Sequence, residues 1–211
     1  MNKTSKYILG IVTVLLVAYF SLDIENLHEH QAKITQKAFD ATEYAARFWE
    51  DDLPKSTSVA IPVTILLKSL EDNPQEAFKK YGRKLGISKT DYFMVKGTGI
   101  IQSVGDDYLS VSIDNNTDVR IATDFIFGNA VRDGSGQVDI NTFLNMTDFN
   151  NASVAIDKLV KEKVVSRLRK AAAPGKQLEF AGAVEIREDQ TNLDSLRIIP
   201  VQVAVSDGKT K

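Results

Sequence analysis

The feature that most constrains the fold is a strand-rich run over residues 91–133, in which short apolar segments are separated by polar turns. Residues 109–114 alternate apolar and polar side chains, a period of two that is typical of a strand with one face in a core and the other in water. The turns at 105–107 and 115–118 are rich in Gly, Asp and Asn, which suit hairpin turns. The run therefore predicts an antiparallel β meander.

Three helices are predicted before the meander. They cover residues 41–51, 59–70 and 74 to about 86. Asp40 with Glu43 three positions later has the pattern of a capping box at the start of the first helix. Pro54 predicts a break after it. Asn73, directly before a proline, predicts the start of the third helix.

The segments after the meander complete an α+β pattern. The sequence predicts a short strand at 138–140, a loop at 143–149, a long helix at 152–172 starting after Asn150 or Asn151, and strands at 178–186 and 196–205. Three or four strands, one helix and two strands is the order of an OB-like antiparallel β-barrel. Gly97 and Gly99 suit the bend by which the first strand serves both halves of such a barrel. An open sheet with the helix on one face is the alternative.

The N-terminus has the pattern of an export signal. Two lysines precede an uncharged apolar run over residues 7–22, and Asp23 and Glu25 close it. As a helix the run spans roughly 24 Å, a little short of a membrane's hydrocarbon core. Phe20 stands where a peptidase site needs a small residue. We expect an uncleaved anchor, with a cleaved signal or a buried first helix as alternatives.

These features divide the chain into five parts. They are a signal anchor or transmembrane helix at 1–26, a spacer at 27–38, a helical segment packed on the barrel at 39–90, an OB-like β domain at 91–205 and a tail at 206–211.

Composition and charge argue against several classes of function. The 26 Lys and Arg nearly balance the 28 Asp and Glu, whereas a nucleic-acid-binding protein normally has a basic excess. The absence of cysteine excludes disulfides, thiol catalysis and cysteine-ligated zinc. The only two histidines, His28 and His30, lie in the spacer, so a catalytic Ser-His-Asp set inside the domain is excluded. The alternating acids and amides at 114–118 favour a hairpin turn over a calcium loop. No metal or cofactor is expected.

The most suggestive polar group lies around the end of the strand-rich run. Arg132 and Asp133 are predicted at a strand end before a flexible turn, and Asn141, Asn145 and Asp148 lie in the following loop. Such side chains can bind a sugar or an acidic group through paired hydrogen bonds. The alternative is that Arg132 and Asp133 pair with each other and the amides form turns.

Several short motifs in a fixed order carry a resemblance to a known family. They are residues 81–83, 93–99, 128–133, 148–151, 180–183 and 199–201, which together represent residues 39–205. The chain resembles domain-of-unknown-function family 2291, the predicted periplasmic lipoproteins. The resemblance implies an extracytoplasmic, membrane-tethered protein with an accessory role in carbohydrate uptake, because the family's genes often lie beside sugar ABC-transporter genes. This chain lacks the cysteine that would carry the lipid.

We therefore expect a membrane-anchored protein on the periplasmic side of the inner membrane that binds or assists and is not an enzyme. Its expected partners are the membrane, through the N-terminal helix, and either a sugar or a component of a sugar transporter. The alternative is an envelope structural or assembly partner that binds no small ligand. A carboxylate-based hydrolase would require two acids with perturbed pKa values in one cleft.

Overall fold

The structure is a computed structural model that describes residues 39–86, 88–114, 117–190, 193 and 196–208. The expected anchor at residues 1–26 and the spacer at 27–38, with its two histidines, lie outside the described residues. From Asp40 onward the chain combines helices with a single sheet.

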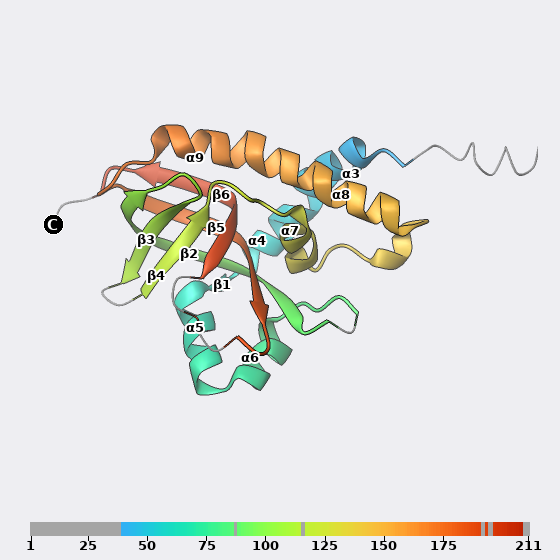
Figure 1. Cartoon of the computed structure of the whole chain (residues 1–211), viewed down its shortest axis with the longest axis horizontal. Helices are drawn as coiled ribbons and strands as arrows, with labels where there is room; N and C mark the ends of the chain where they lie inside the picture. The colour runs from blue at the N-terminus through green and yellow to red at the C-terminus, as the bar shows by residue number, and fades with distance from the viewer. Residues whose placement is uncertain (1–38, 87, 115–116, 191–192, 194–195, 209–211) are drawn as a thin grey trace, which may run out of the picture. The chain divides into compact units, whose positions relative to one another are not determined.

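In the described part of the chain, six strands form this sheet and five of them close into a ring (Figure 1). The strands are β1 (Ile61–Pro62), β2 (Thr90–Val104), β3 (Tyr108–Asp114), β4 (Thr117–Ala122), β5 (Gln177–Arg187) and β6 (Arg197–Ser206). β2 pairs antiparallel with both β3 and β5, and β3–β4 and β5–β6 are also antiparallel. The ring closes where β4 runs parallel to β6, at the pairs Arg120–Arg197 and Ile121–Ile198.

Three strands precede the helices and two strands follow them, as predicted, but two helical runs and a short 3₁₀ helix lie between β4 and β5 where one helix was predicted. Each of the five strands in the ring is hydrogen-bonded to two other strands of the ring, which agrees with the OB-like arrangement rather than with the open sheet. The short strand β1 lies outside the ring and pairs parallel with β2 at Ile61–Val95.

β2 is the strand shared by the two halves of the ring. Its residues 90–100 pair with β5, and its residues 100–104 pair with β3. Gly97 and Gly99 lie where neighbouring atoms approach the strand most closely. A Cβ at Gly97 would lie 2.8 Å from the Phe180 ring, and a Cβ at Gly99 would lie closer than 3.0 Å to the Ser112 carbonyl oxygen. Both positions therefore require a residue without a side chain.

The first helical run is longer than predicted. It consists of α3 (Ala41–Arg47), the π-helix η1 (Phe48–Asp52) and α4 (Leu53–Ser58). Asp40 caps it as predicted, because its carboxylate accepts hydrogen bonds from the backbone N–H groups of Thr42 and Glu43. The predicted break at Pro54 is wrong. This proline lies in the first turn of α4, directly after the wide π turn, where a missing N–H is tolerated.

The next two helices differ from the prediction at three of their four ends: the first begins and ends later than predicted, and the second ends earlier. They are α5 (Val63–Asp72) and α6 (Pro74–Tyr81). α5 starts after the predicted position because residues 59–62 form a turn and β1. Asn73 caps α6, as predicted. α6 ends early because Gly82 is extended and Arg83 exchanges two backbone hydrogen bonds with Tyr92 of β2.

The strand-rich run ends at β4, because the chain next forms α7 (Gly128–Ser135). The predicted position of Arg132 and Asp133 at a strand end is therefore wrong: both lie on this helix, whose buried side chains recur at helical spacing. The predicted strand at 138–140 is also wrong. These residues lead into the short 3₁₀ helix η2 (Ile140–Thr142).

A long helical run lies along one side of the ring, and α5 and α6 lie on another (Figure 1). It consists of α8 (Met146–Leu159), the π-helix η3 (Val160–Val165) and α9 (Ser166–Ala171). It begins before the predicted position at 152, because Asn145 and not Asn150 or Asn151 is the N-cap. The Asn145 side chain accepts a hydrogen bond from the Asp148 backbone N–H at 2.9 Å. The predicted loop at 143–149 is thus partly helical.

The sheet packs apolar side chains on both faces, which produces two cores. The first fills the ring and includes Phe93, Val95, Leu109, Ile121 and Leu178. The second lies between the sheet and the helices and includes Phe48, Met94, Val131, Ile156 and Ile199. Residues 180–184 of β5 are all buried, because the side chains on one face of this strand belong to the first core and those on the other face belong to the second.

Replacing Gly99 with alanine is expected to destabilise the fold by roughly 1–3 kcal/mol, because the crowding atoms include the Ser112 backbone, which cannot move without disturbing the β2–β3 pairing. Urea unfolding of the full-length protein in detergent micelles measures the difference.

Gly134→Ala is the matched control. Gly134 lies within α7, and a Cβ there would have its nearest neighbour at 3.5 Å, an ordinary contact. This change is expected to stabilise the helix by about 0.5–1 kcal/mol. Equal effects of the two substitutions would contradict the close approach at Gly99.

Candidate functional site

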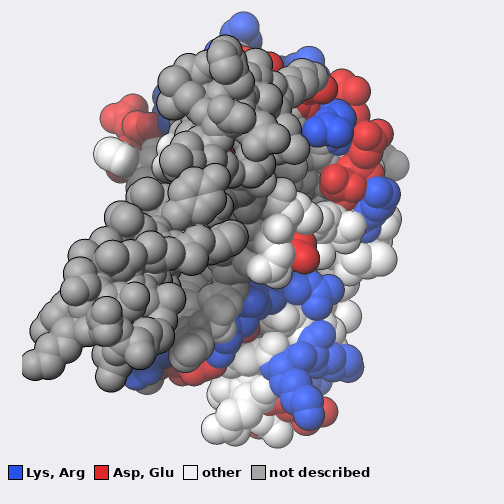
Figure 2. All heavy atoms as spheres, turned by 90° about the vertical axis from the view of Figure 1, so that its right-hand side faces the viewer, with Lys and Arg blue, Asp and Glu red and all other residues white. Residues whose placement is uncertain are grey.

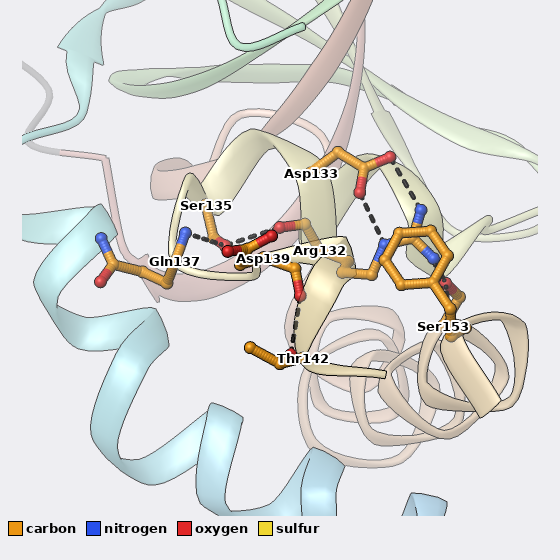
Figure 3. Close-up of polar contacts among 8 residues, drawn as sticks. Arg132, Asp133, Ser135, Gln137, Asp139, Thr142 and Ser153 are labelled. Atoms are coloured by element: carbon orange, nitrogen blue, oxygen red, sulfur yellow. Dashed lines mark hydrogen bonds and ion pairs between the residues drawn. The ribbon is translucent and has the colours of Figure 1, made fainter. Parts of the chain in front are cut away.

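The predicted pair Arg132 and Asp133 forms a buried clamp between helices (Figure 3). The Arg132 guanidinium donates two hydrogen bonds to the Asp133 carboxylate, at 2.6 and 2.9 Å, and both side chains are almost completely buried. Its remaining nitrogen donates to the Phe149 carbonyl oxygen at 3.1 Å and to the Ser153 hydroxyl on α8. The guanidinium carbon also lies 3.4 Å from the centre of the Phe149 ring. These contacts fasten α7 to α8.

The other three predicted site residues serve local turns. Asn145 caps α8 and donates a side-chain hydrogen bond to the Asp148 carboxylate at 3.0 Å. Asn141 donates from its backbone and its side chain to the Asp139 carboxylate. Within the described residues, no hydrogen bond or ion pair joins these three to Arg132 or Asp133. The ligand-binding role of the five residues stays a prediction, and their contacts match the structural alternative.

A different group of polar residues lies around an open pocket of about 610 Å³. The pocket is formed by α6, the segment after it, the start of β2 and the residue after β5. It is lined by Pro74, Gln75, Phe78, Lys79, Gly82, Lys84, Asp91 and Glu188. Its volume lies in the range of small-molecule sites, and it combines an apolar wall with a few convergent charges.

Asp91 is the buried polar group of this pocket. Its side chain is 5% exposed, and its Oδ2 atom is buried without a hydrogen-bond donor in the described structure. The ammonium of Lys84 lies 3.4 Å from that atom, an ion pair without hydrogen-bond geometry, and also pairs with Glu188. Burial raises the pKa of the Asp91 carboxyl above its ordinary value of 3.8, and the charge of Lys84 partly offsets this rise.

Gly82 allows the Asp91 carboxylate to approach the end of α6. A Cβ on Gly82 would lie 2.5 Å from the Phe78 carbonyl oxygen and 2.7 Å from Asp91 Oδ1. Any side chain at position 82 would therefore clash with the Asp91 carboxylate, so the absence of a side chain at Gly82 allows both residues to line the pocket.

The pocket lies in a basic part of the surface. Lys79 and Lys80 occupy the last turn of α6, and Arg83 and Lys84 follow it. Figure 2 shows Lys and Arg side chains gathered on the lower part of the face that it presents, at the height of α5 and α6 in Figure 1. Lys84 differs from the other three because it pairs with two carboxylates at the pocket.

Sequence reasoning missed this site, although one signal was present. Asp91 stands in register with Phe93 and Val95 on the buried face of β2, so a charged residue occupies a core-facing position of the strand. Lys84 and Glu188 gave no such signal, because they are exposed loop residues brought to Asp91 only by the fold.

A metal centre finds no support among the described residues. They contain no group of three or more His, Asp or Glu side chains arranged to hold an ion. The described helices also include none that is long and apolar enough to cross a membrane.

Two comparisons with known proteins match this chain. The family described as "Predicted periplasmic lipoprotein (DUF2291)" matches residues 12–204. The fold is similar to the crystal structure of an OB-fold protein from Thermotoga maritima MSB8, with a TM-score of 0.73 and 25% sequence identity, covering 81% of this chain and 100% of that one. No curated protein gives a significant match.

Replacing Arg132 with alanine is expected to destabilise the protein by roughly 3–5 kcal/mol, because the change leaves the Asp133 carboxylate buried without its partner. Arg187→Ala is the control. Arg187 holds Asp189 through the same two-bond geometry, but solvent screens this exposed pair, so little change is expected. Chemical denaturation measures both, and comparable losses would contradict the clamp.

The Asp91 carboxyl predicts a pH dependence of stability. Its raised pKa means that the folded protein binds this proton more tightly than the unfolded chain does. The resulting stability is present below the ordinary pKa and is lost as the pH rises through the folded-state pKa. Asp91→Asn stays neutral, so its stability relative to the wild type is expected to increase as the pH rises above 3.8, the ordinary pKa of the carboxyl. Denaturant unfolding at several pH values measures this.

Asp189→Asn is the exposed comparison. The hydrogen bond from Arg187 lowers the pKa of Asp189, so the stability it contributes has the opposite sign of pH dependence, present above the ordinary pKa and lost as the pH falls, and solvent screening of this exposed pair keeps the effect small. Parallel pH curves for wild type and Asp91→Asn would show that burial does not shift the Asp91 carboxyl.

Proposed function

Because the chain belongs to the family of predicted periplasmic lipoproteins, we propose that it is a membrane-anchored extracytoplasmic binding protein that assists carbohydrate ABC transport. Its ligand is a sugar, bound in the pocket around Asp91. The observation that carries this proposal is the buried carboxylate of Asp91 in the wall of a pocket of small-molecule size, where the Lys84 ammonium lies 3.4 Å from its Oδ2 atom.

The anchor part of the proposal rests on the sequence. The family name implies a lipid attached to cysteine, and none of the 211 residues is cysteine. The apolar run over residues 7–22 offers a protein anchor in place of the lipid. Its preceding lysines favour an orientation that puts the domain outside the cytoplasm.

The ligand class follows from the donors and acceptors of the pocket. The Asp91 carboxylate is buried against the partly exposed Lys84 side chain, and a ligand hydroxyl that displaces this side chain would donate a hydrogen bond to the carboxylate. Lys84 and Glu188 provide a further donor and acceptor beside it. Pro74 and Phe78 form an apolar wall against which the C–H face of a sugar ring can pack.

The proposed role is binding without chemistry. Both carboxylates of the pocket, Asp91 and Glu188, lie against the same ammonium group of Lys84. A hydrolase needs its two carboxyl groups on either side of the bond that is cleaved. Asp91 and Glu188 instead face the same ammonium group, which supports a site that holds hydroxyl groups in place.

Thermal unfolding of the full-length protein in detergent micelles, with a panel of pentoses, hexoses and disaccharides, tests the proposal. A sugar at one hundred times its dissociation constant stabilises by about 2.7 kcal/mol. For a chain of this size the melting temperature is then expected to rise by roughly 5–10 °C. Glu188→Gln should reduce the shift, because the amide has less acceptor capacity and no longer holds Lys84 as an ion pair.

The neighbouring Asp189→Asn is the matched control, because Asp189 does not line the pocket and pairs with Arg187 instead. It should keep the full sugar response. If no sugar of the panel raises the melting temperature, sugar binding is contradicted.

The alternative role is an envelope structural or assembly partner without a small ligand. Crosslinking to an envelope protein in intact membranes, together with no sugar response, would favour it.

A further inference from the structure

Two large apolar side chains stand exposed on the loop that leads into α8. Leu144 is 83% exposed and Met146 is 56% exposed. Asn145 between them is the N-cap of α8, so its hydrogen bond to the first turn holds the loop in place. Single exposed apolar residues are common on soluble proteins, so their position in the fold decides whether the pair has a role.

This loop lies where the chain enters the domain. α3 begins directly after Asp40 and packs beside the N-terminal part of α8 (Figure 1). The Tyr44 ring of α3 meets the Phe143 ring edge-on, with 5.2 Å between the ring centres. Phe143 directly precedes Leu144, so the exposed pair is adjacent to the first turns of the domain.

The sequence before the domain limits its distance from a membrane. The apolar run ends at residue 22, and residues 23–39 connect it to α3. A connection of that length spans roughly 26 Å as a helix and at most roughly 60 Å when fully extended. A tether of this length keeps the start of α3 within reach of the surface and raises the effective concentration of neighbouring side chains there.

We infer that Leu144 and Met146 insert into the lipid surface and hold the domain against the membrane by its α3–α8 end. This inference rests on the membrane anchoring of the proposed function and is independent of the sugar site. Asp148 lies in the first turn of α8, two residues after Met146, so contact with a zwitterionic surface is favoured over an anionic one. Because the contact is apolar, it is expected to persist at high salt.

The absence of native cysteine allows a direct test. Full-length Leu144→Cys, labelled with a polarity-sensitive fluorophore, is reconstituted into phosphatidylcholine vesicles. Val59→Cys is the matched control: Val59 is 78% exposed but follows α4, at the far end of the helical run from Asp40 and roughly 27 Å away along that run. Vesicle flotation reports anchoring separately, and quenching by lipid-borne spin labels reports insertion.

The expected result is co-flotation of both variants, with a blue-shifted emission and strong lipid quenching at position 144 and neither at position 59. Leu144→Glu and Met146→Glu together should abolish the quenching of a label at the exposed position 147 while the protein still floats. Co-flotation with position 144 remaining in water would overturn the inference and leave the anchor intact. Failure to float would overturn the anchoring premise together with the inference.

Discussion

The double pairing of β2 is the constraint on which the rest of the structure depends. One strand hydrogen-bonds to β5 along most of its length and to β3 at its end, and this sharing brings the two halves of the sheet into a ring. Close approach at Gly97 and Gly99 makes the sharing possible. Both faces of the sheet then become available for burial, one toward the ring interior and one toward the helices.

The helices are held on this scaffold by apolar burial and by one polar clamp. Phe48, Ile156 and Met94 belong to the core between the helices and the sheet, and α7 packs on β2 and β5. Arg132 links α7 to α8 with all of its hydrogen bonds directed inward. A buried arginine with every contact satisfied positions elements, and it offers little to a ligand. The Asp91 carboxylate is held less completely, because the Lys84 ammonium lies 3.4 Å from its Oδ2 atom, outside good hydrogen-bond geometry.

Sequence reasoning recovered the elements with strong local signals. The caps at Asp40 and Asn73 and the strands of the meander and of the C-terminal pair were found, because capping and period-two burial are encoded within a few residues. It failed at α7 and at the start of α8, where weak apolar patterns take their structure from the neighbours they pack against. The candidate site was missed because Lys84, Asp91 and Glu188 are far apart in the chain and carry no shared motif.

The sequence by itself determined the α+β class, the five strands of the ring in their chain order, the family and the lack of cysteine, since each is a property of local pattern or composition. Only the tertiary structure decided that β4 and β6 meet to close the ring, that Arg132 is buried and engaged, and that Asp91 lies in a pocket beside Lys84. These outcomes depend on which distant surfaces are removed from water together. Burial changes the energy of a charged group far more than its sequence neighbours do, and it is set by the whole fold.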